Sequence, residues 1–179
     1  STILSGSTIK VYYVKDETQT KELSYNVKYF KDGIEVEADA YTVKEKVWVN
    51  APNMINVKTI DTSNTRYTGY KFDKTNPDVV PTNIANESTI NVYYVKDITQ
   101  TKELSYNVKY YIDGVEVTGD AYTEKQIVWI NDDNMIDVKE ISKENNRYTG
   151  YKFDRTDPQT IPSTILSGST IKVYYVKDE

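Results

Sequence analysis

Tyrosines that occur in pairs are the side chains best suited to contact a ligand. Tyr12, Tyr93 and Tyr174 each stand before a second tyrosine in a repeated Val-Tyr-Tyr-Val sequence. Neighbouring side chains of a strand point to opposite faces of the sheet, so one ring of each pair has to face away from the other. An outward ring can stack on a sugar or pack against a protein partner. We therefore take Tyr12, Tyr93 and Tyr174 as candidate contacts to a glycan or a partner.

A structural role for the same tyrosines is the stronger expectation. Tyrosine is a favoured strand residue, and cross-strand aromatic pairs stabilise a sheet by about 0.2–1 kcal/mol each. A small core also recruits tyrosine, because the ring can be buried while the hydroxyl stays in water. The chain has 17 Tyr against 3 Phe and a hydrophobic fraction of only 38%, which points to such a core.

An oxygen-rich stretch could hold a calcium ion through carboxylate and amide groups. It runs from Asn131 to Asn134 and is followed by Asp137. In a second copy of this stretch, Ala51 and Pro52 replace two of the oxygen-bearing residues. A helix cap or a solvated loop is therefore expected here, and we expect no metal and no other cofactor.

Lysine and asparagine side chains could form an intramolecular isopeptide bond. This reaction needs an apolar core that keeps the amine neutral and a nearby acid protonated. Asn50 and Asn131 follow apolar segments and could supply the amide, while Lys28 and Lys109 could supply the amine. Lys28 alternates with apolar residues, so it is expected on the solvent face, and no such bond is expected.

The sequence offers few of the side chains that catalyse reactions. The chain contains no Cys and no His, which excludes thiol nucleophiles, imidazole bases and Cys- or His-ligated metals. Asp154 and Asp157 could form a carboxylate pair, but Asn76 stands where the other copy would need an acid. A loop before proline is the simpler interpretation. We expect that the protein is not an enzyme.

Charge and hydropathy restrict the partners further. Lys and Arg number 22 and Asp and Glu number 27, giving a net charge of -5, so a phosphate backbone is a poor partner. No apolar run is long enough to span a membrane, and the first residues do not have the regions of a signal peptide. We therefore expect neither nucleic acid nor membrane as a partner.

An internal repeat sets the organisation of the 179-residue chain. Residues 20–29 recur unchanged at 101–110, which is 81 positions further on, and residues 1–17 are identical to residues 163–179. Internal repeats of this kind indicate tandem units. We assign residues 1–17 to a C-terminal strand fragment of a preceding repeat, 18–97 to repeat unit 1 and 98–179 to repeat unit 2.

Hydrophobic periodicity predicts a mainly β unit of four to five strands with at most one short helix. Residues 23–29 alternate apolar and polar side chains and lead into Asp32-Gly33, which predicts a hairpin. Further strands are expected at 41–49, 68–72 and 88–96. The last of these is apolar on both faces, which suits a central position. We expect residues 51–64 to be irregular, with at most one or two helical turns.

These motifs resemble a known class of repeats. The Tyr-x-Val-x-Tyr strand from Tyr25 to Tyr29 with its Asp-Gly hairpin, the Gly-Tyr-Lys-Phe strand at Gly69, and the closing strand at Thr89 are similar to mucin-binding-protein-type (MucBP-like) tandem repeats. Those repeats belong to cell-surface adhesins of Gram-positive bacteria. The resemblance implies a β-grasp-like fold, an extracellular location and attachment to the cell wall.

Two functions follow as hypotheses. In the first, the chain is a structural stalk that spaces a functional tip from the cell wall, with neighbouring repeats as its partners and a monomeric state. The alternative is weak, multivalent binding of mucin or other host glycans. The connection after Asp97 lacks Gly, Pro and Ser, which favours a stiff array, and Ile98 stands where the other copy has Glu17. We therefore expect Ile98 to be buried at an inter-repeat junction.

Overall fold

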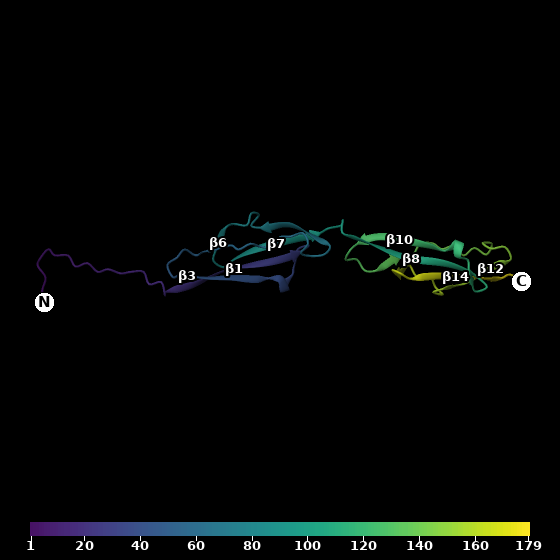
Figure 1. Cartoon of the computed structure of the whole chain (residues 1–179), viewed down its shortest axis with the longest axis horizontal. Helices are drawn as coiled ribbons and strands as arrows, with labels where there is room; N and C mark the ends of the chain where they lie inside the picture. Colours follow the sequence, from purple (N-terminus) through teal and green to yellow (C-terminus); the bar gives the residue numbers. More distant parts are fainter. The chain divides into compact units, whose positions relative to one another are not determined.

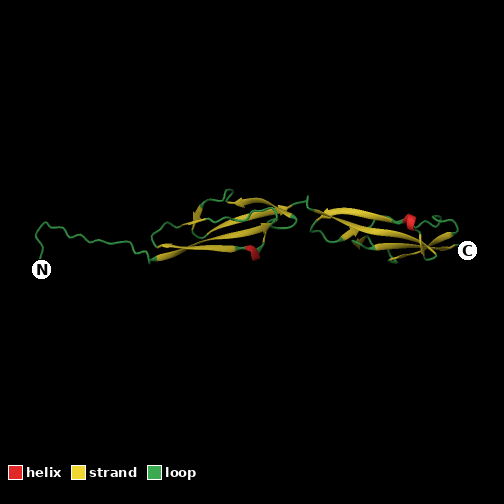
Figure 2. Ribbon diagram, in the orientation of Figure 1, coloured by secondary structure: helices red, strands yellow, loops and turns green.

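The computed structural model describes residues 1–179, and its regular secondary structure consists almost entirely of strands (Figure 2). It divides into two compact units. The first comprises Ser1–Asn64 and Phe72–Val95, and the second comprises Thr65–Lys71 and Lys96–Glu179. The segment Thr65–Lys71 thus lies in the first sequence repeat but in the second compact unit. None of the helical turns has the length and apolar character needed to span a bilayer.

One mixed sheet forms the main body of the first unit. Its strands are β1 (Thr20–Lys31), β2 (Ile34–Glu35), β3 (Tyr41–Trp48), β5 (Tyr70–Asn76) and β7 (Ser88–Lys96). The strand order is β2-β1-β7-β5, and β3 also pairs with β1. The two central strands β1 and β7 run parallel, and β3 is antiparallel to β1 (Figure 1). The short strand β2 is also antiparallel to β1.

The second unit repeats this sheet. Its strands are β8 (Thr101–Ile112), β9 (Val115–Glu116), β10 (Tyr122–Trp129), β12 (Tyr151–Asp157) and β14 (Thr170–Lys177). The order is β10-β8-β14-β12, β9 pairs with β8, and the central strands β8 and β14 run parallel. The first and last long strands of each unit are therefore parallel neighbours, as in a β-grasp-like unit. The prediction of a mainly β fold is confirmed.

The periodicity of β1 explains its burial. Leu23, Tyr25, Val27 and Tyr29 are buried, and the residues between them are only half-buried. The hairpin that follows requires positive φ at both central residues of its turn. Asp32 has a φ of 47° and Gly33 a φ of 80°. The predicted Asp-Gly hairpin is thus present.

The last strand of each unit lies at the centre of the sheet, as its two apolar faces predict. In β7 the buried face carries Ile90, Val92 and Tyr94, while Tyr93 and Val95 are half-buried on the opposite face. In the second unit the same inward positions of β8 and β14 make up most of the hydrophobic core. Both faces of this strand are therefore largely covered.

The segment expected to be irregular contains a strand and no helix. Met54–Asn56 forms β4, which pairs antiparallel with β6 (Asn83–Ala85). The second unit has the same small sheet, from β11 (Met135–Asp137) and β13 (Thr164–Leu166). Ile55 and Ile136 are buried there, and their packing attaches each segment to the core of its unit. The short 3₁₀ turns lie elsewhere, at Glu37–Asp39 and Thr118–Asp120.

Residues 1–17 do not form the strand that was expected of them. The identical residues near the C-terminus include β14, which is hydrogen-bonded to β8 on one side and β12 on the other. Residues 1–17 pair with no strand, and Tyr12 is 81% exposed. A strand is stable only where neighbouring strands satisfy its backbone groups. The missing partners explain why one sequence takes two conformations.

Candidate functional site

The paired tyrosines face opposite sides of the sheet, as alternation predicts. Tyr94 and Tyr175 are each 1% exposed and lie in the cores of their units. The preceding residues Tyr93 and Tyr174 are half-buried on the outer face. Tyr12 stands on the unpaired N-terminal stretch, where it has no sheet to lie on. The structure therefore brings only Tyr93 and Tyr174 of the three candidates onto a sheet surface.

Each outer tyrosine stacks on an aromatic residue of the adjacent parallel strand. Tyr174 lies opposite Tyr111 in the β14–β8 register, and their ring centres are 5.1 Å apart. The guanidinium of Arg155 lies 4.1 Å from the centre of the Tyr174 ring. In the first unit Tyr93 stacks on Phe30 at the same 5.1 Å. These outer aromatic pairs are stabilising cross-strand contacts in the first place.

A shallow groove of about 350 Å³ lies beside the outer pair of the second unit. Its lining comprises Arg155, Thr156, Asp157, Gln159 and Tyr174. The Thr156 hydroxyl is buried and donates to the carbonyl of Pro158 at 2.8 Å. The groove therefore combines an aromatic ring with a guanidinium, a carboxylate and an amide, so it offers a stacking surface beside hydrogen-bond donors and acceptors. We call it the Tyr174 groove.

The buried tyrosines use their hydroxyls to hold the segment that follows β11. The Tyr110 hydroxyl donates to the carbonyl of Ser142 at 2.9 Å, and the Tyr175 hydroxyl donates to the carbonyl of Glu144 at 2.8 Å. The first unit has the same bonds, from Tyr29 to Asp61 and from Tyr94 to Ser63. These carbonyls lie in a segment without regular structure, so the tyrosine hydroxyls supply hydrogen bonds that a helix or a strand would otherwise supply. The excess of inward Tyr over Phe was the sequence signal for this role.

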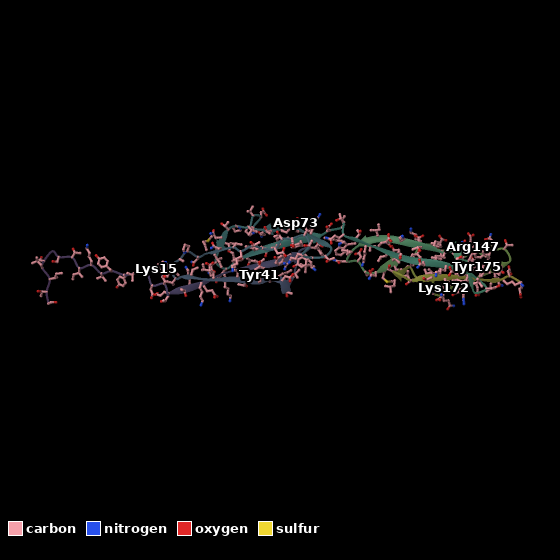
Figure 3. The ribbon with its side chains drawn as sticks, in the orientation of Figure 1. Lys15, Tyr41, Asp73, Arg147, Lys172 and Tyr175 are labelled. Atoms are coloured by element: carbon pink, nitrogen blue, oxygen red, sulfur yellow. The ribbon has the colours of Figure 1, made fainter.

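Arg147 forms a cluster that sequence reasoning missed. Its guanidinium lies 3.8 Å from the ring centre of Tyr110 and 3.9 Å from a carboxylate oxygen of Asp120. The Tyr148 hydroxyl donates to the same carboxylate at 2.5 Å. Burial raises the pKa of Tyr110 and Tyr148, and together with nearby tyrosines it raises the pKa of Tyr122 to about 12. Figure 3 labels Arg147 beside the core of this unit.

The oxygen-rich stretch binds a lysine of its own unit. The Lys102 ammonium donates to the carbonyl of Asp132, and it donates to Oδ1 of Asn134 at 2.8 Å. In the first unit, Lys21 contacts the carbonyl of Ala51 and Oδ1 of Asn53 in the same way. These oxygens thus have a protein cation as partner, and the stretch is a loop rather than a helix cap.

The lysines considered for an isopeptide bond lie in half-buried ion pairs. Lys28 Nζ is 3.9 Å from Glu35 and Lys109 Nζ is 3.8 Å from Glu116. Asn131 Nδ2 donates to the carbonyl of Thr68 at 2.7 Å. The structure therefore does not bring the amine and the amide together.

A tight turn at residues 67–70 belongs to the second unit and contacts β10. The Trp129 indole Nε1 donates to the carbonyl of Gly69 at 3.1 Å, and the Trp129 ring packs edge-on against Tyr70. Gln100 accepts from the Gly69 amide at 2.8 Å and donates to the Tyr70 carbonyl at 3.1 Å. Trp129 is half-buried, and its indole hydrogen bond is to this turn.

Ile98 is not buried, which corrects the prediction made for it. It is 74% exposed and lies in a turn in which Thr99 donates to Oδ1 of Asp97 at 3.0 Å. The residue of this turn that makes contacts is Gln100, whose side chain bonds the 67–70 turn. Side chains in a turn do not alternate between two faces as they do in a strand. The side chain of Ile98 therefore points to solvent.

Comparisons with known proteins give matches of low similarity. No family model matches the sequence, and no curated protein matches it. Among solved structures, the chain is similar to "Streptococcal High Identity Repeats in Tandem (SHIRT) domains 3-4 from cell surface protein", at 11% identity and a TM-score of 0.40, covering 88% of this chain and 98% of that one. It is also similar to the type 2 repeat of the mucus binding protein MUB from Lactobacillus reuteri, at 14% identity and a TM-score of 0.28, covering 87% of this chain and 100% of that one. A third structure, Mub-RV, has 13% identity, a TM-score of 0.28, and coverage of 88% and 100%.

Proposed function

We propose that the chain is a structural repeat segment of a bacterial cell-surface protein, which acts as a monomeric spacer between the cell wall and a functional tip. The observation that carries this proposal is the short, hydrogen-bonded connection after β7. The Gln100 amide donates to the carbonyl of Asp97 at 3.2 Å, and the Asp97 amide donates to the carbonyl of Gly69 at 2.8 Å. These residues all belong to the second unit, so the bonds order the chain where that unit begins. An ordered connection suits a spacer, because flexible linkers let domains move independently.

The organisation of the core supports the same role. The buried tyrosine hydroxyls donate to backbone carbonyls of their own unit, so their protons are used in holding the fold together. In the outer aromatic pair of the second unit the two rings stack on each other, and the Arg155 guanidinium lies over the Tyr174 ring. A spacer requires a stable, solvated unit and no further chemistry, and these contacts supply that stability.

The stiffness of the connection can be measured directly. The chain has no Cys, so a Lys44→Cys/Lys125→Cys variant places one spin label at an exposed site in each unit. Pulsed electron–electron double resonance then gives the distribution of distances between the two labels. We expect a single narrow distribution. A control variant with a Gly-Ser insertion after Ile98 should broaden it, and equal breadth without the insertion would contradict the spacer role.

A second function is favoured by the Tyr174 groove. Weak binding of mucin or another glycan would use the Tyr174 ring for stacking and Arg155, Asp157 and Gln159 for hydrogen bonds. The corresponding residues of the first unit include Lys74 and Asn76, so the two units would differ in preference. Repetition would raise the avidity of such weak sites.

Binding to immobilised mucin and a glycan panel, with albumin as the blank surface, tests this second function. We expect a signal that a free sugar displaces and that Tyr174→Ala or Gln159→Ala reduces. Val79→Ala, at an exposed residue outside the groove, serves as the control. Absence of binding by a folded sample would leave the spacer role alone.

A further inference from the structure

The 67–70 turn shows how the fold accepts a tryptophan and an asparagine from the end of a neighbouring strand. Trp129 Nε1 donates to the carbonyl of Gly69 and Asn131 Nδ2 donates to the carbonyl of Thr68. Gly69 has a φ of 87° and is buried. A Cβ at this position would come within 2.9 Å of the Trp129 ring and would also collide with the Asn131 amide. Only glycine allows this close approach.

The same turn is present a second time, but there no side chain packs against its glycine. Residues 147–151 repeat the Arg-Tyr-Thr-Gly-Tyr sequence, and Gly150 has a φ of 85°. The Tyr151 amide donates to the carbonyl of Tyr148 at 3.1 Å, and the Asp178 amide donates to that of Gly150 at 2.9 Å. The 67–70 turn has both bonds at nearly equal lengths. A Cβ at Gly150, however, would meet no atom within 4 Å.

The complementary side chains are also present a second time. Gln19, Trp48 and Asn50 lie 81 positions before Gln100, Trp129 and Asn131. They stand on the same frame, because the Val49 amide donates to the carbonyl of Gln19 as the Ile130 amide does to that of Gln100, both at 2.8 Å. Asn50 is exposed, and Trp48 Nε1 donates to the carbonyl of Asp16 at 3.1 Å.

We propose that the 148–151 turn is a docking surface for the Gln19, Trp48 and Asn50 side chains of a second copy of this chain. The carbonyl of Gly150 would replace that of Asp16 as the acceptor for the Trp48 indole, and the Asn50 amide would donate to the carbonyl of Thr149. The contact is heterologous, joining the first unit of one chain to the second unit of the next. It does not depend on the proposed spacer role.

This association should be weak, because the Asp16 carbonyl competes for Trp48 within the chain. We expect a dissociation constant of about a millimolar. Heteronuclear NMR of the full chain over a concentration series should show the Gly150 amide shifting with concentration, and sedimentation should show the matching growth in mass. Trp48→Phe keeps the packing but removes the donor, and it should weaken the association at least tenfold.

Two further variants complete the test, Asn50→Ala as a second probe of the contact and Gly119→Ala as a control. Asn50 is exposed and its loss should not impair folding, yet it should also weaken the association. Gly119 is an exposed glycine with no nearby atom, so Gly119→Ala should change nothing. A Gly150 amide that does not move with concentration would overturn the proposal. Association that Trp48→Phe and Asn50→Ala leave unchanged would also overturn it.

Discussion

The hydroxyl of Tyr175 donates a 2.8 Å hydrogen bond to the carbonyl oxygen of Glu144. The two residues belong to the central strand β14 and to a segment without regular structure. Tyr94 and Ser63 repeat the bond in the first unit. Because such a segment cannot satisfy its own backbone groups, tyrosine hydroxyls from the sheet do so. This relationship explains why the chain is rich in Tyr and poor in Phe.

Replacing Tyr175 by Phe should destabilise the second unit. The ring stays buried while the hydrogen bond to the carbonyl of Glu144 is lost, which costs about 0.5–1.5 kcal/mol for a typical intramolecular hydrogen bond. Urea unfolding followed by circular dichroism measures this change. Tyr111→Phe is the matched control, because the first unit already has Phe30 at this position and the stacked pair is kept. Equal effects of the two changes would contradict the role of the hydroxyl.

Stability should fall as the pH rises above the ordinary pKa of tyrosine. Burial, followed by the neighbouring Tyr110, raises the pKa of Tyr122 from 10.0 to about 12 in the folded chain. The folded state therefore holds its proton longer than the unfolded state, so this contribution is complete below pH 10 and is lost between pH 10 and about 12. Urea unfolding over this range should show a steeper loss for the native chain than for Tyr122→Phe. Parallel curves would contradict the assignment.

Two glycines with the same backbone conformation should respond differently to alanine. Gly69→Ala and Gly150→Ala both place a Cβ at a φ near 85°, which costs about 1–2 kcal/mol in each case. Gly69→Ala also forces the Trp129 ring and the Asn131 amide away. We expect it to lower the unfolding midpoint of the second unit more than Gly150→Ala does. The pair controls for strain, and equal midpoints would show that the turn is not closely packed.

The turn after β7 should keep the Asp97 carboxyl ionised at low pH. Hydrogen bonds from the Thr99 hydroxyl and amide, and from Gln100, hold the pKa of Asp97 below 3.8. Because the folded pKa is depressed, this contribution is present above pH 3.8 and is lost as the pH falls through the folded value. In a carbon-13 NMR titration, Thr99→Val should raise the pKa of Asp97. The pKa of Asp16, which Thr18 depresses in the same way, should not change.

Much of the fold could be predicted from residue alternation. The periodicity of β1, the Asp-Gly turn and the apolar last strand identified the hairpin and the central strand, because a half-buried strand imposes a period of two on its residues. Alternation also placed Tyr94 in the core and Tyr93 outside it. The small sheet from β4 and β6 was missed, since a strand of three residues leaves too short a pattern.

The site residues depended more on tertiary contacts. The grouping of Arg155, Asp157 and Gln159 beside Tyr174 arises from the pairing of β12 with β14, which no local pattern reports. Ile98 replaces the Glu17 of the other copy, which suggested a buried contact, yet Ile98 is exposed. The contacts that were expected of Ile98 are made by Gln100. The direction of a side chain in a turn follows from its hydrogen bonds rather than from its hydrophobicity.

The sequence by itself determined the repeat and, within each strand, the face on which each side chain lies, because these follow from local periodicity. It could not determine whether a given stretch becomes a strand. Residues 1–17 and 163–179 are identical, yet only the latter contain strands, β13 and β14. The longer strand β14 lies between β8 and β12, which satisfy its backbone amides and carbonyls and cover its apolar side chains. Strand structure requires partners, and only the tertiary structure decides which segment has them.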